Sequence, residues 1–301
     1  MAWMLWAGGR TVTMVSPDSP IFPRIVIVGL GLVGGSIAFG ARRAWPSTHV
    51  TAVDRESVLR AALSRRAIDE TADDVAVVAG ADLIVLAAPV RQNITLLKRV
   101  AAHAAPSAVI TDVGGTKRAI VETAEGLSES VTFIGGHPLG GAAHGGFEFA
   151  TAGLFARRPW IFTPHDASGT DALERLSAFV TVLGARVATM TALEHDRLLA
   201  LISHLPQLAT TALMDVVGKG ATASGLRMAG QGLVDTTRLA SSPADVWRDI
   251  CATNAEEIRG ALDLLIEQLL EMRSELERAE IVDAMFSDAA GWRAELMKGR
   301  D

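Results

Sequence analysis

One histidine in this sequence is well suited to acid–base chemistry. His137 lies in the motif GGHPLGG (135–141), directly after an apolar run that we predict to be a buried strand. An imidazole titrates near neutral pH, and glycines on both sides let a ligand approach the ring closely. A lone histidine is more often structural, but this setting favours a base that takes a proton from a hydroxyl group as hydride leaves the same carbon.

A glycine-rich turn and one acidic residue predict a nucleotide site. The sequence GLGLVG (29–34) matches G-x-G-x-x-G, follows the apolar run 25–29 and opens a helical pattern, and Asp54 ends the next apolar run. In this setting the glycines let the backbone approach a pyrophosphate at the helix N-terminus, and the carboxylate accepts hydrogen bonds from ribose hydroxyl groups. The predicted cofactor contacts are Gly29, Leu30, Gly31, Leu32, Val33, Gly34, Asp54 and Arg55.

The identity of this cofactor follows from the charge after the second apolar run. A carboxylate at Asp54 repels a 2′-phosphate, so NAD is favoured over NADP. Arg55 could stack on adenine, tolerate the phosphate or be only a solvated residue at a helix start. Ala88, Pro89 and Val90 end a further apolar run, where open α/β sheets bind ligands, although a proline that simply ends a strand explains them equally well.

Short apolar runs predict the strands that position these residues. Helical patterns separate several of the runs, and such alternation with nearly continuous apolar strands indicates a parallel sheet covered on both faces. The runs are 25–29, 50–54, 82–88, 108–113, 131–136 and 160–164, and the helical patterns between them are 57–66, 92–104 and 117–126.

The second half of the sequence has a different pattern. Helical periodicity dominates after about residue 194, and Pro206 should kink the first long helix. We therefore predict an α/β Rossmann-type N-terminal domain that binds NAD and an all-α C-terminal domain. The predicted boundaries are 1–22 for a flexible arm, 23–190 for the first domain and 191–301 for the second, whose long helical stretches are 194–217, 244–277 and 279–297.

The composition excludes several classes of partner. The 301 residues include 28 Lys and Arg and 34 Asp and Glu, giving a net charge of −6, and no basic stripe forms for nucleic acid or an anionic membrane. The single cysteine, Cys251, excludes an intramolecular disulfide and a multi-cysteine metal cluster and is typical of the cytoplasm. The sequence contains no tyrosine, which excludes a tyrosine acid of the kind used by short-chain dehydrogenases.

Three features have two explanations each. The run 25–41 is uncharged over 17 residues, near the lower limit for a bilayer span, but its five glycines favour a turn inside a strand–loop–helix unit. His195 and His204 share one predicted helix, but no third ligand at suitable spacing accompanies them, so we predict no metal site. Arg238 is either a surface salt-bridge residue or a bidentate clamp for a carboxylate.

Taken together, the motifs resemble the prephenate/arogenate dehydrogenase family of tyrosine biosynthesis. The resemblance spans about residues 24–279 and implies a Rossmann domain that binds the nicotinamide cofactor and a helical domain that forms a homodimer. It implies NAD-dependent oxidative decarboxylation of prephenate to 4-hydroxyphenylpyruvate, in which hydride leaves C4, CO₂ leaves C1 and the ring becomes aromatic. The matching motifs are GLGLVGGS (29–36), VTAVDR (50–55), TDVGGTK (111–117), GGHPLGG (135–141), HDRLLALISHLP (195–206) and DTTRLASSPADVWRDI (235–250).

The resemblance also implies roles for single residues. His137 would hold the ring hydroxyl group of the substrate and act as the base, and Arg238 would bind a substrate carboxylate. The remaining residues expected to line the substrate pocket are Ser203, His204, Gln207, Gly115 and Thr116.

Four positions depart from the family pattern. Gly115 replaces a serine whose hydroxyl supports the histidine and the substrate, unless Thr116 supplies that hydroxyl instead. Ala142 and Ala143 stand where many relatives carry a serine or threonine and then a glutamate, and Gln207 stands where a histidine is frequent. The departures leave the dehydrogenase chemistry in place and affect recognition of the substrate side chain.

Prephenate is favoured over arogenate, because the ammonium group of arogenate needs a carboxylate partner and none is identified. A protonated His144 would favour the more anionic substrate further. The alternatives are an arogenate or dual (cyclohexadienyl) dehydrogenase and a non-catalytic NAD(H) sensor, which would need Asp54 but not His137 together with Arg238. The 3-hydroxyacid dehydrogenases use a helical lysine with an asparagine four residues later, which none of the four lysines has.

Overall fold

The computed structural model describes residues 19–128, 130–140, 145–165 and 168–298. The chain forms two compact units, residues 1–255 and 256–301, and each is described by itself. In the described part of the chain, none of the helices combines the length and the apolar character needed to cross a membrane.

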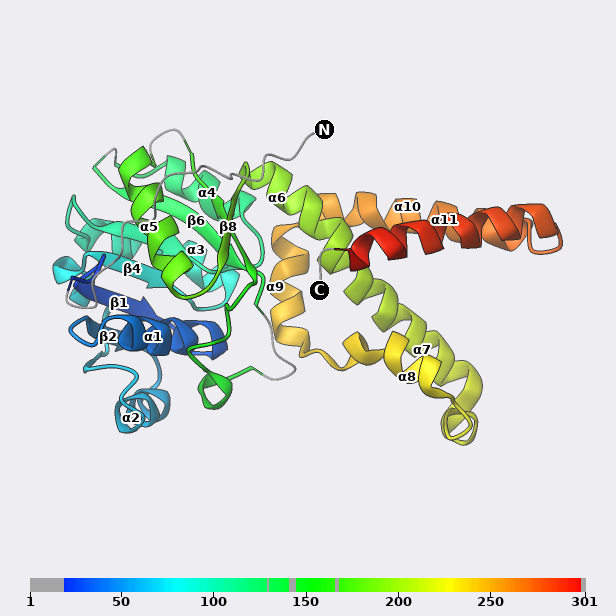
Figure 1. The fold of residues 1–301 in the computed structure, drawn as a ribbon, viewed down its shortest axis with the longest axis horizontal. Coiled ribbons are helices and arrows are strands. Elements are labelled where there is room, and N and C mark those ends of the chain that lie inside the picture. Colours follow the sequence, from blue (N-terminus) through cyan, green and yellow to red (C-terminus); the bar gives the residue numbers. More distant parts are fainter. Residues whose placement is uncertain (1–18, 129, 141–144, 166–167, 299–301) are drawn as a thin grey trace. The chain divides into compact units, whose positions relative to one another are not determined.

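The first unit is built on one eight-stranded sheet with the order β3-β2-β1-β4-β5-β6-β7-β8 (Figure 1). Strands β1 to β6 run parallel, β7 runs antiparallel to β6, and β8 runs parallel to β7. The strands are β1 (Arg24–Val28), β2 (His49–Val53), β3 (Glu70–Ala72), β4 (Leu83–Leu86), β5 (Val109–Asp112), β6 (Thr132–Pro138), β7 (Pro159–Thr163) and β8 (Arg186–Thr189).

Helices cover both faces of the sheet, as the apolar runs predict. Along β1, Ile25 and Ile27 belong to one core cluster and Val26 and Val28 to the other, because successive side chains of a strand point to opposite faces. The first cluster includes residues of α1 (Leu32–Ala44), α2 (Glu56–Ser64) and α5 (Thr170–Val182), and the second includes residues of α3 (Val90–His103) and α4 (Arg118–Glu125). The α/β Rossmann-type fold class is therefore confirmed.

The prediction that the sixth apolar run continues a parallel sheet is wrong. After β6 the chain returns through a connection whose described part contains only one short 3-10 helix, η2 (Phe147–Phe149), so β7 starts at the edge where β6 ends. The N–H of Leu139 donates to the carbonyl of Pro159 at 2.8 Å, and this bond joins the two ends of the connection. The edge strands β3 and β8 escaped prediction because both are short and carry no continuous apolar run.

The helical half is helical in all three predicted stretches, but two of the stretches are interrupted. The first stretch is interrupted by a π-helical turn, η3 (Ala200–His204), just before Pro206, which has no N–H to continue the ladder. The stretch 244–277 breaks at Asn254, whose φ of −132° lies outside the helical region. The elements are α6 (Ala192–Leu199), α7 (Leu205–Leu226), α8 (Gln231–Thr236), η4 (Arg238–Ser241), α9 (Ala244–Thr253), α10 (Ala255–Ser274) and α11 (Ala279–Met297).

Candidate active site

The glycine-rich turn joins β1 to α1 and is open at one position. Gly29 has a φ of +100°, and a Cβ there would lie 2.6 Å from the Ala87 carbonyl carbon, so only glycine fits. A Cβ at Gly34 would collide with the carbonyl oxygen of Gly29. A Cβ at Gly31 would meet nothing within 4 Å, so the backbone of the turn is open to a ligand at this residue.

The N-terminus of α1 is suited to an anion. Gly31 caps the helix without a side-chain hydrogen bond, and the first turn, which contains Leu32 and Val33, carries no acidic residue. Within the described residues no side chain caps these N–H groups, so they can bind phosphate oxygens with help from the helix dipole. The turn and the helix end fit the pyrophosphate of a dinucleotide.

Asp54 follows β2 and is tied to the glycine-rich turn. Its Oδ2 accepts a hydrogen bond from the N–H of Leu30 at 2.6 Å, and its Oδ1 accepts one from the N–H of Arg55 at 2.6 Å. The Arg55 side chain is 85% exposed, with its Nε 3.8 Å from Asp54 Oδ1. Asp54 therefore stands beside the turn with its carboxylate already oriented.

The residues Ala88, Pro89 and Val90 form the link from β4 to α3. Pro89 caps α3, and the N–H of Ala88 donates to Oδ1 of Asn93 at 3.1 Å. The same amide donates from Nδ2 to the carbonyl of Leu86 at 3.0 Å, and Asn93 is fully buried. This link lies at the carboxyl end of β4, where doubly wound sheets bind ligands.

A buried ion pair braces the segments around the candidate base. Asp112 and Lys117 are both fully buried and form an ion pair with each other. Asp112 also accepts hydrogen bonds from the N–H of Gly114 at 2.8 Å and of Gly136 at 3.1 Å. Burial lowers the pKa of Lys117 from its usual value, and the neighbouring Asp112 opposes this shift. The pair fixes the loop after β5 against the residue that precedes His137.

His137 is the first member of a chain of three hydrogen-bonded side chains. Its Nδ1 lies 2.8 Å from Nε2 of His195, and Nδ1 of His195 lies 2.8 Å from Oδ1 of Asp196. His195 and Asp196 are fully buried. The N–H groups of Lys117 and Arg118 donate to the two oxygens of Asp196 at 2.7 and 2.9 Å. Asp196 therefore joins the start of α4 to α6 and anchors the histidines.

The acceptor at the end of this chain decides where the protons lie. A carboxylate only accepts hydrogen bonds, so His195 carries its proton on Nδ1 and presents a bare Nε2. His137 must then donate from Nδ1, which leaves its Nε2 with a free lone pair. His137 Nε2 has no hydrogen-bond partner among the described residues, so it is ready to accept a proton.

The electrostatics keep this base neutral. Burial lowers the pKa of His137 well below its ordinary value of 6.5, and His195, Lys117 and His204 lower it further. The pKa of His195 is also lowered, chiefly by burial, with Asp196 acting in the opposite direction. At neutral pH both rings are uncharged, which is the state a general base requires.

The predicted substrate residues near the base are brought together only in part. A Cβ at Gly115 would lie 3.9 Å from His137 Nε2, so this loop passes directly beside the base. The hydroxyl of Thr116 is buried and bonds the hydroxyl of Thr253 at 2.7 Å. Ser203 is half-buried on η3, beside the buried His204.

Gln207 and Arg238 are linked through one turn. Gln207 is buried, its Nε2 donates to the carbonyl of Leu239 at 2.7 Å, and its Oε1 accepts from the hydroxyl of Ser242 at 3.0 Å. Arg238 is exposed at the start of η4, the turn that Gln207 holds. Ala142, Ala143 and His144 lie outside the described residues.

Sequence reasoning missed the residues that support the base. His195 is considered only as a possible metal ligand with His204, and no supporting role is predicted for Asp196, Asn254 or the pair Asp112 and Lys117. The adjacency of a histidine and an aspartate was the one available signal. Within the described residues, no group of three or more His, Cys, Asp or Glu side chains is arranged to hold a metal ion.

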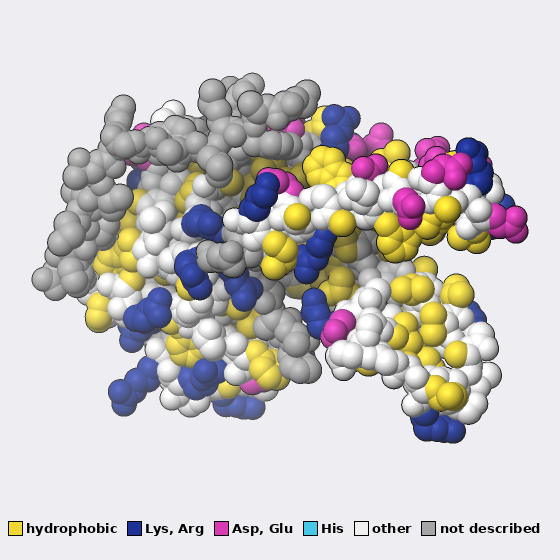
Figure 2. Space-filling model, turned by 45° about the vertical axis from the view of Figure 1, so that its right-hand side comes forward, with side chains coloured by type: hydrophobic (Ala, Val, Ile, Leu, Met, Phe, Trp, Pro, Cys, Tyr) yellow, Lys and Arg dark blue, Asp and Glu magenta, His cyan; other side chains and the backbone are white. Residues whose placement is uncertain are grey.

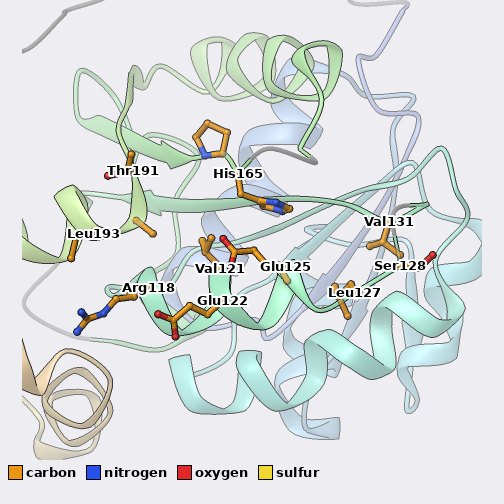
Figure 3. Close-up of a pocket in the computed structure, with 13 residues that line it drawn as sticks. Arg118, Val121, Glu122, Glu125, Leu127, Ser128, Val131, His165, Thr191 and Leu193 are labelled. Atoms are coloured by element: carbon orange, nitrogen blue, oxygen red, sulfur yellow. The ribbon is translucent and has the colours of Figure 1, made fainter.

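A separate groove of about 710 Å³ lies between α4 and the start of α6 (Figure 3). It contains none of the site residues that the sequence predicts. Figure 3 shows Glu122 and Arg118 on α4 at one side and Thr191 and Leu193 at the other. The lining residues are Arg118, Val121, Glu122, Ala124, Glu125, Leu127, Ser128, Val131, Pro164, His165, Thr191, Ala192 and Leu193.

A doubly wound sheet with an open glycine turn, an acidic residue after β2 and a neutral histidine with a free ring nitrogen is typical of a Rossmann-type dehydrogenase. Residues 37–189 match the family model for the nucleotide-binding domain of prephenate dehydrogenase, and residues 191–286 match the model for its dimerization domain. The chain belongs to the prephenate dehydrogenase family, and it is an oxidoreductase.

Curated relatives carry the same function. The chain is 32% identical over 277 residues to prephenate dehydrogenase of Bacillus subtilis, a match that covers 89% of this chain and 75% of that protein. It is 30% identical over 259 residues to cyclohexadienyl dehydrogenase of Zymomonas mobilis, covering 84% and 88%. These relatives support a dehydrogenase activity in tyrosine biosynthesis.

Solved structures of prephenate and arogenate dehydrogenases have a similar fold. Prephenate dehydrogenase from Aquifex aeolicus, in complex with hydroxyphenyl propionate and NAD⁺, has a TM-score of 0.84 and 27% identity, covering 91% of this chain and 98% of that one. Arogenate dehydrogenase of Synechocystis has a TM-score of 0.78 and 28% identity, covering 91% and 99%.

Proposed function

We propose that this protein oxidises prephenate with NAD, releasing CO₂ and 4-hydroxyphenylpyruvate. The observation that carries the proposal is the chain from Asp196 through His195 to His137, which leaves a lone pair on His137 Nε2 beside Gly115. The family match supplies the reaction class, and this geometry supplies the base that the reaction needs.

The residues around the glycine turn would hold NAD. The open position at Gly31 and the uncapped N-terminus of α1 fit the pyrophosphate, and the carboxylate of Asp54 fits the adenosine ribose. Bound NAD supplies the hydride acceptor. Because Asp54 is an anion, the site rejects the 2′-phosphate of NADP.

His137 handles the proton of the substrate's ring hydroxyl group. Its Nε2 accepts that proton as hydride leaves C4, so that a carbonyl forms there. When CO₂ leaves C1, the electrons of the broken bond make the ring aromatic and place negative charge on the C4 oxygen. The same nitrogen returns the proton to this oxygen, so the reaction releases no net proton. His195 and Asp196 hold the ring in the required tautomer throughout.

The remaining substrate contacts come from the helical half. Arg238 is a cation suited to a substrate carboxylate, with Ser203 and His204 as further polar groups. Prephenate is preferred because an ammonium group, as in arogenate, needs a carboxylate beside it. The neutral side chain at Gln207 offers none, and its amide is already bonded to Leu239 and Ser242.

The active form is a homodimer in the cytoplasm. The dimerization-domain match supports self-association, and the helices of the second unit expose large apolar side chains. Figure 2 shows such side chains, in yellow, gathered along the helices of the helical half. The one cysteine, Cys251, is a free thiol, in agreement with a reducing compartment.

The test is a comparison of two substrates. Purified protein is mixed with NAD and either prephenate or arogenate, and NADH formation is followed by absorbance. We expect the larger kcat/KM with prephenate. A tenfold larger value with arogenate would overturn the preference and indicate an acidic residue elsewhere in the pocket. Tight NAD binding without turnover of either compound would favour the non-catalytic sensor.

A further inference from the structure

We propose that Asn254 is a positioning residue that fixes His204 as a hydrogen-bond donor at the active site. Asn254 is fully buried at the C-terminus of α9. Its Nδ2 donates to the main-chain carbonyl of Asp196 at 2.8 Å and lies 3.3 Å from Nδ1 of His204. The role toward the substrate rests on the proposed function, whereas the tautomer of His204 follows from these contacts alone.

The orientation of the Asn254 amide is set by Asp196. A carbonyl oxygen only accepts hydrogen bonds, so the amide nitrogen, not the amide oxygen, must face it. The second hydrogen on Nδ2 then points toward Nδ1 of His204. The Oδ1 of Asn254 is buried and has no partner among the described residues, so no other contact competes for this orientation.

The bond from Asn254 decides the proton position on His204. Its Nδ1 acts as an acceptor, so the proton of the neutral ring is on Nε2. Burial lowers the pKa of His204 to about 4, and the ring stays neutral at pH 7. Its Nε2 has no hydrogen-bond partner in the described part of the chain and is not among the buried polar atoms left unpaired. The free N–H is available to an oxygen of the substrate.

Asp196 therefore controls two histidines in opposite ways. Its carboxylate acts through His195 and makes His137 an acceptor at Nε2. Its main-chain carbonyl acts through Asn254 and makes His204 a donor at Nε2. The arrangement assigns proton removal to His137 alone, and His204 donates to a carbonyl or carboxylate oxygen of the substrate.

The tautomer can be measured without substrate. In full-length protein labelled with ¹⁵N-histidine, long-range ¹H–¹⁵N correlation spectra at pH 7 distinguish the two neutral tautomers, and the His204→Gln spectrum identifies the signal of His204. We expect the Nε2–H form in the unmodified protein. A dominant Nδ1–H form would overturn the proposal, whether or not the protein oxidises prephenate.

Two matched variants test the cause. Asn254→Asp replaces the donor with an acceptor and should convert His204 to the Nδ1–H form. It should also lower kcat/KM for prephenate at least tenfold while the KM for NAD stays within twofold. Asn93→Asp makes the same change at another fully buried asparagine, beside the nucleotide residue Ala88, and should leave the His204 tautomer unaltered.

The outcomes separate a positioning role from a structural one. If Asn254→Asp folds, as judged by circular dichroism, but His204 keeps the Nε2–H form, Asn254 does not set the tautomer and the proposal fails. If the tautomer converts and turnover of prephenate is unchanged, His204 does not donate to the substrate, and the catalytic part fails. If the variant does not fold, the spectrum of the unmodified protein remains the deciding measurement.

Discussion

In the proposed mechanism, the chemistry of this site depends on one nitrogen atom, Nε2 of His137. Asparagine at this position keeps a polar group of similar size but cannot take a proton. We expect His137→Asn to lower kcat by about 10²–10⁴-fold, the usual contribution of a positioned base. The affinity for NAD, measured by fluorescence titration, should stay within twofold because the glycine turn is untouched. Turnover within a few-fold of the unmodified enzyme would return His137 to a structural role.

The proposed function gives Asp54 two roles, which one substitution separates from each other. Its charge repels a 2′-phosphate, and its Oδ2 holds the N–H of Leu30. Asp54→Ser removes the charge and keeps a short acceptor. We expect a higher KM for NAD. The ratio of kcat/KM for NAD to kcat/KM for NADP, measured with saturating prephenate, should be smaller than in the unmodified enzyme. Equal kcat/KM values for the two cofactors in the unmodified enzyme would contradict the assignment.

At this scale the sequence predicts residues for ligand contact, but it does not predict the residues that pack behind them. His137, Asp54 and the glycines lie in motifs whose spacing has a direct physical meaning. The support of the base was not predictable, because Asp196 gathers the N–H groups of Lys117 and Arg118 and the amide of Asn254 from distant parts of the chain. Such partners follow from tertiary packing and leave no local pattern.

Among the elements, α7 and η4 are joined by Gln207. Its amide bonds to Leu239 and Ser242 hold the turn that carries Arg238. Gln207→Leu keeps the bulk and removes both bonds, so Arg238 should lose its fixed position. We expect the KM for prephenate to rise about tenfold, of the order expected from losing about 1.5 kcal/mol of a charged contact, with kcat changed less.

Three further variants control this prediction. Arg238→Ala should raise the KM for prephenate in the same way, and the double variant should be little worse than either single one. Gln231→Leu removes an exposed glutamine whose side chain bonds to Asp235 within α8, and should leave both constants unchanged. An unaltered KM in Gln207→Leu would show that η4 holds its position without this residue.

The elements also show where periodicity fails as a guide. Apolar runs located β1, β2, β4, β5, β6 and β7, because strands buried on both faces need continuous hydrophobic side chains. The direction of β7 could not be predicted, since a buried strand has the same composition in either direction. The break at Asn254 was missed because apolar residues continue on both sides of it with helical spacing.

For the whole molecule, the buried histidines make stability depend on pH. His204 has a pKa of about 4 in the folded protein against 6.5 for an unperturbed imidazole. Between these values the unfolded chain binds a proton that the folded chain does not, so the free energy of unfolding falls as pH decreases. The stability is fully present above about pH 6.5, and the loss from His204 reaches about 3 kcal/mol near pH 4. His137 and His195 act in the same direction.

Urea unfolding at a series of pH values from 7.5 to 4 measures this dependence. His204→Gln removes one titrating group, so its free energy of unfolding should fall less steeply over this range. His49→Gln removes an exposed imidazole in the same way and serves as the control. Equal slopes for the His204 variant and the unmodified protein would show that the ring is not held neutral by burial.

The two helices of the second unit bury little apolar surface of their own. In α11 no described residue is buried, and Phe286 and Trp292 are 70% and 77% exposed. Several large side chains of α10 are about half exposed as well, including Leu264 and Leu269. Monomeric proteins rarely expose apolar patches of this extent, so a second copy of the chain is the expected cover.

A charge placed in this surface should therefore separate the subunits. In sedimentation at micromolar concentration, we expect the unmodified protein to have twice the monomer mass of 31.7 kDa. Trp292→Glu places a carboxylate in the interface of the dimer. Burying a carboxylate that has no cationic partner costs free energy, so the protein should shift toward monomer. Leu63→Glu alters a side chain that is 41% exposed on α2 and should leave the dimer intact. A monomer in the unmodified protein, or a Trp292→Glu variant that dimerises as tightly, would show that these helices are not the interface.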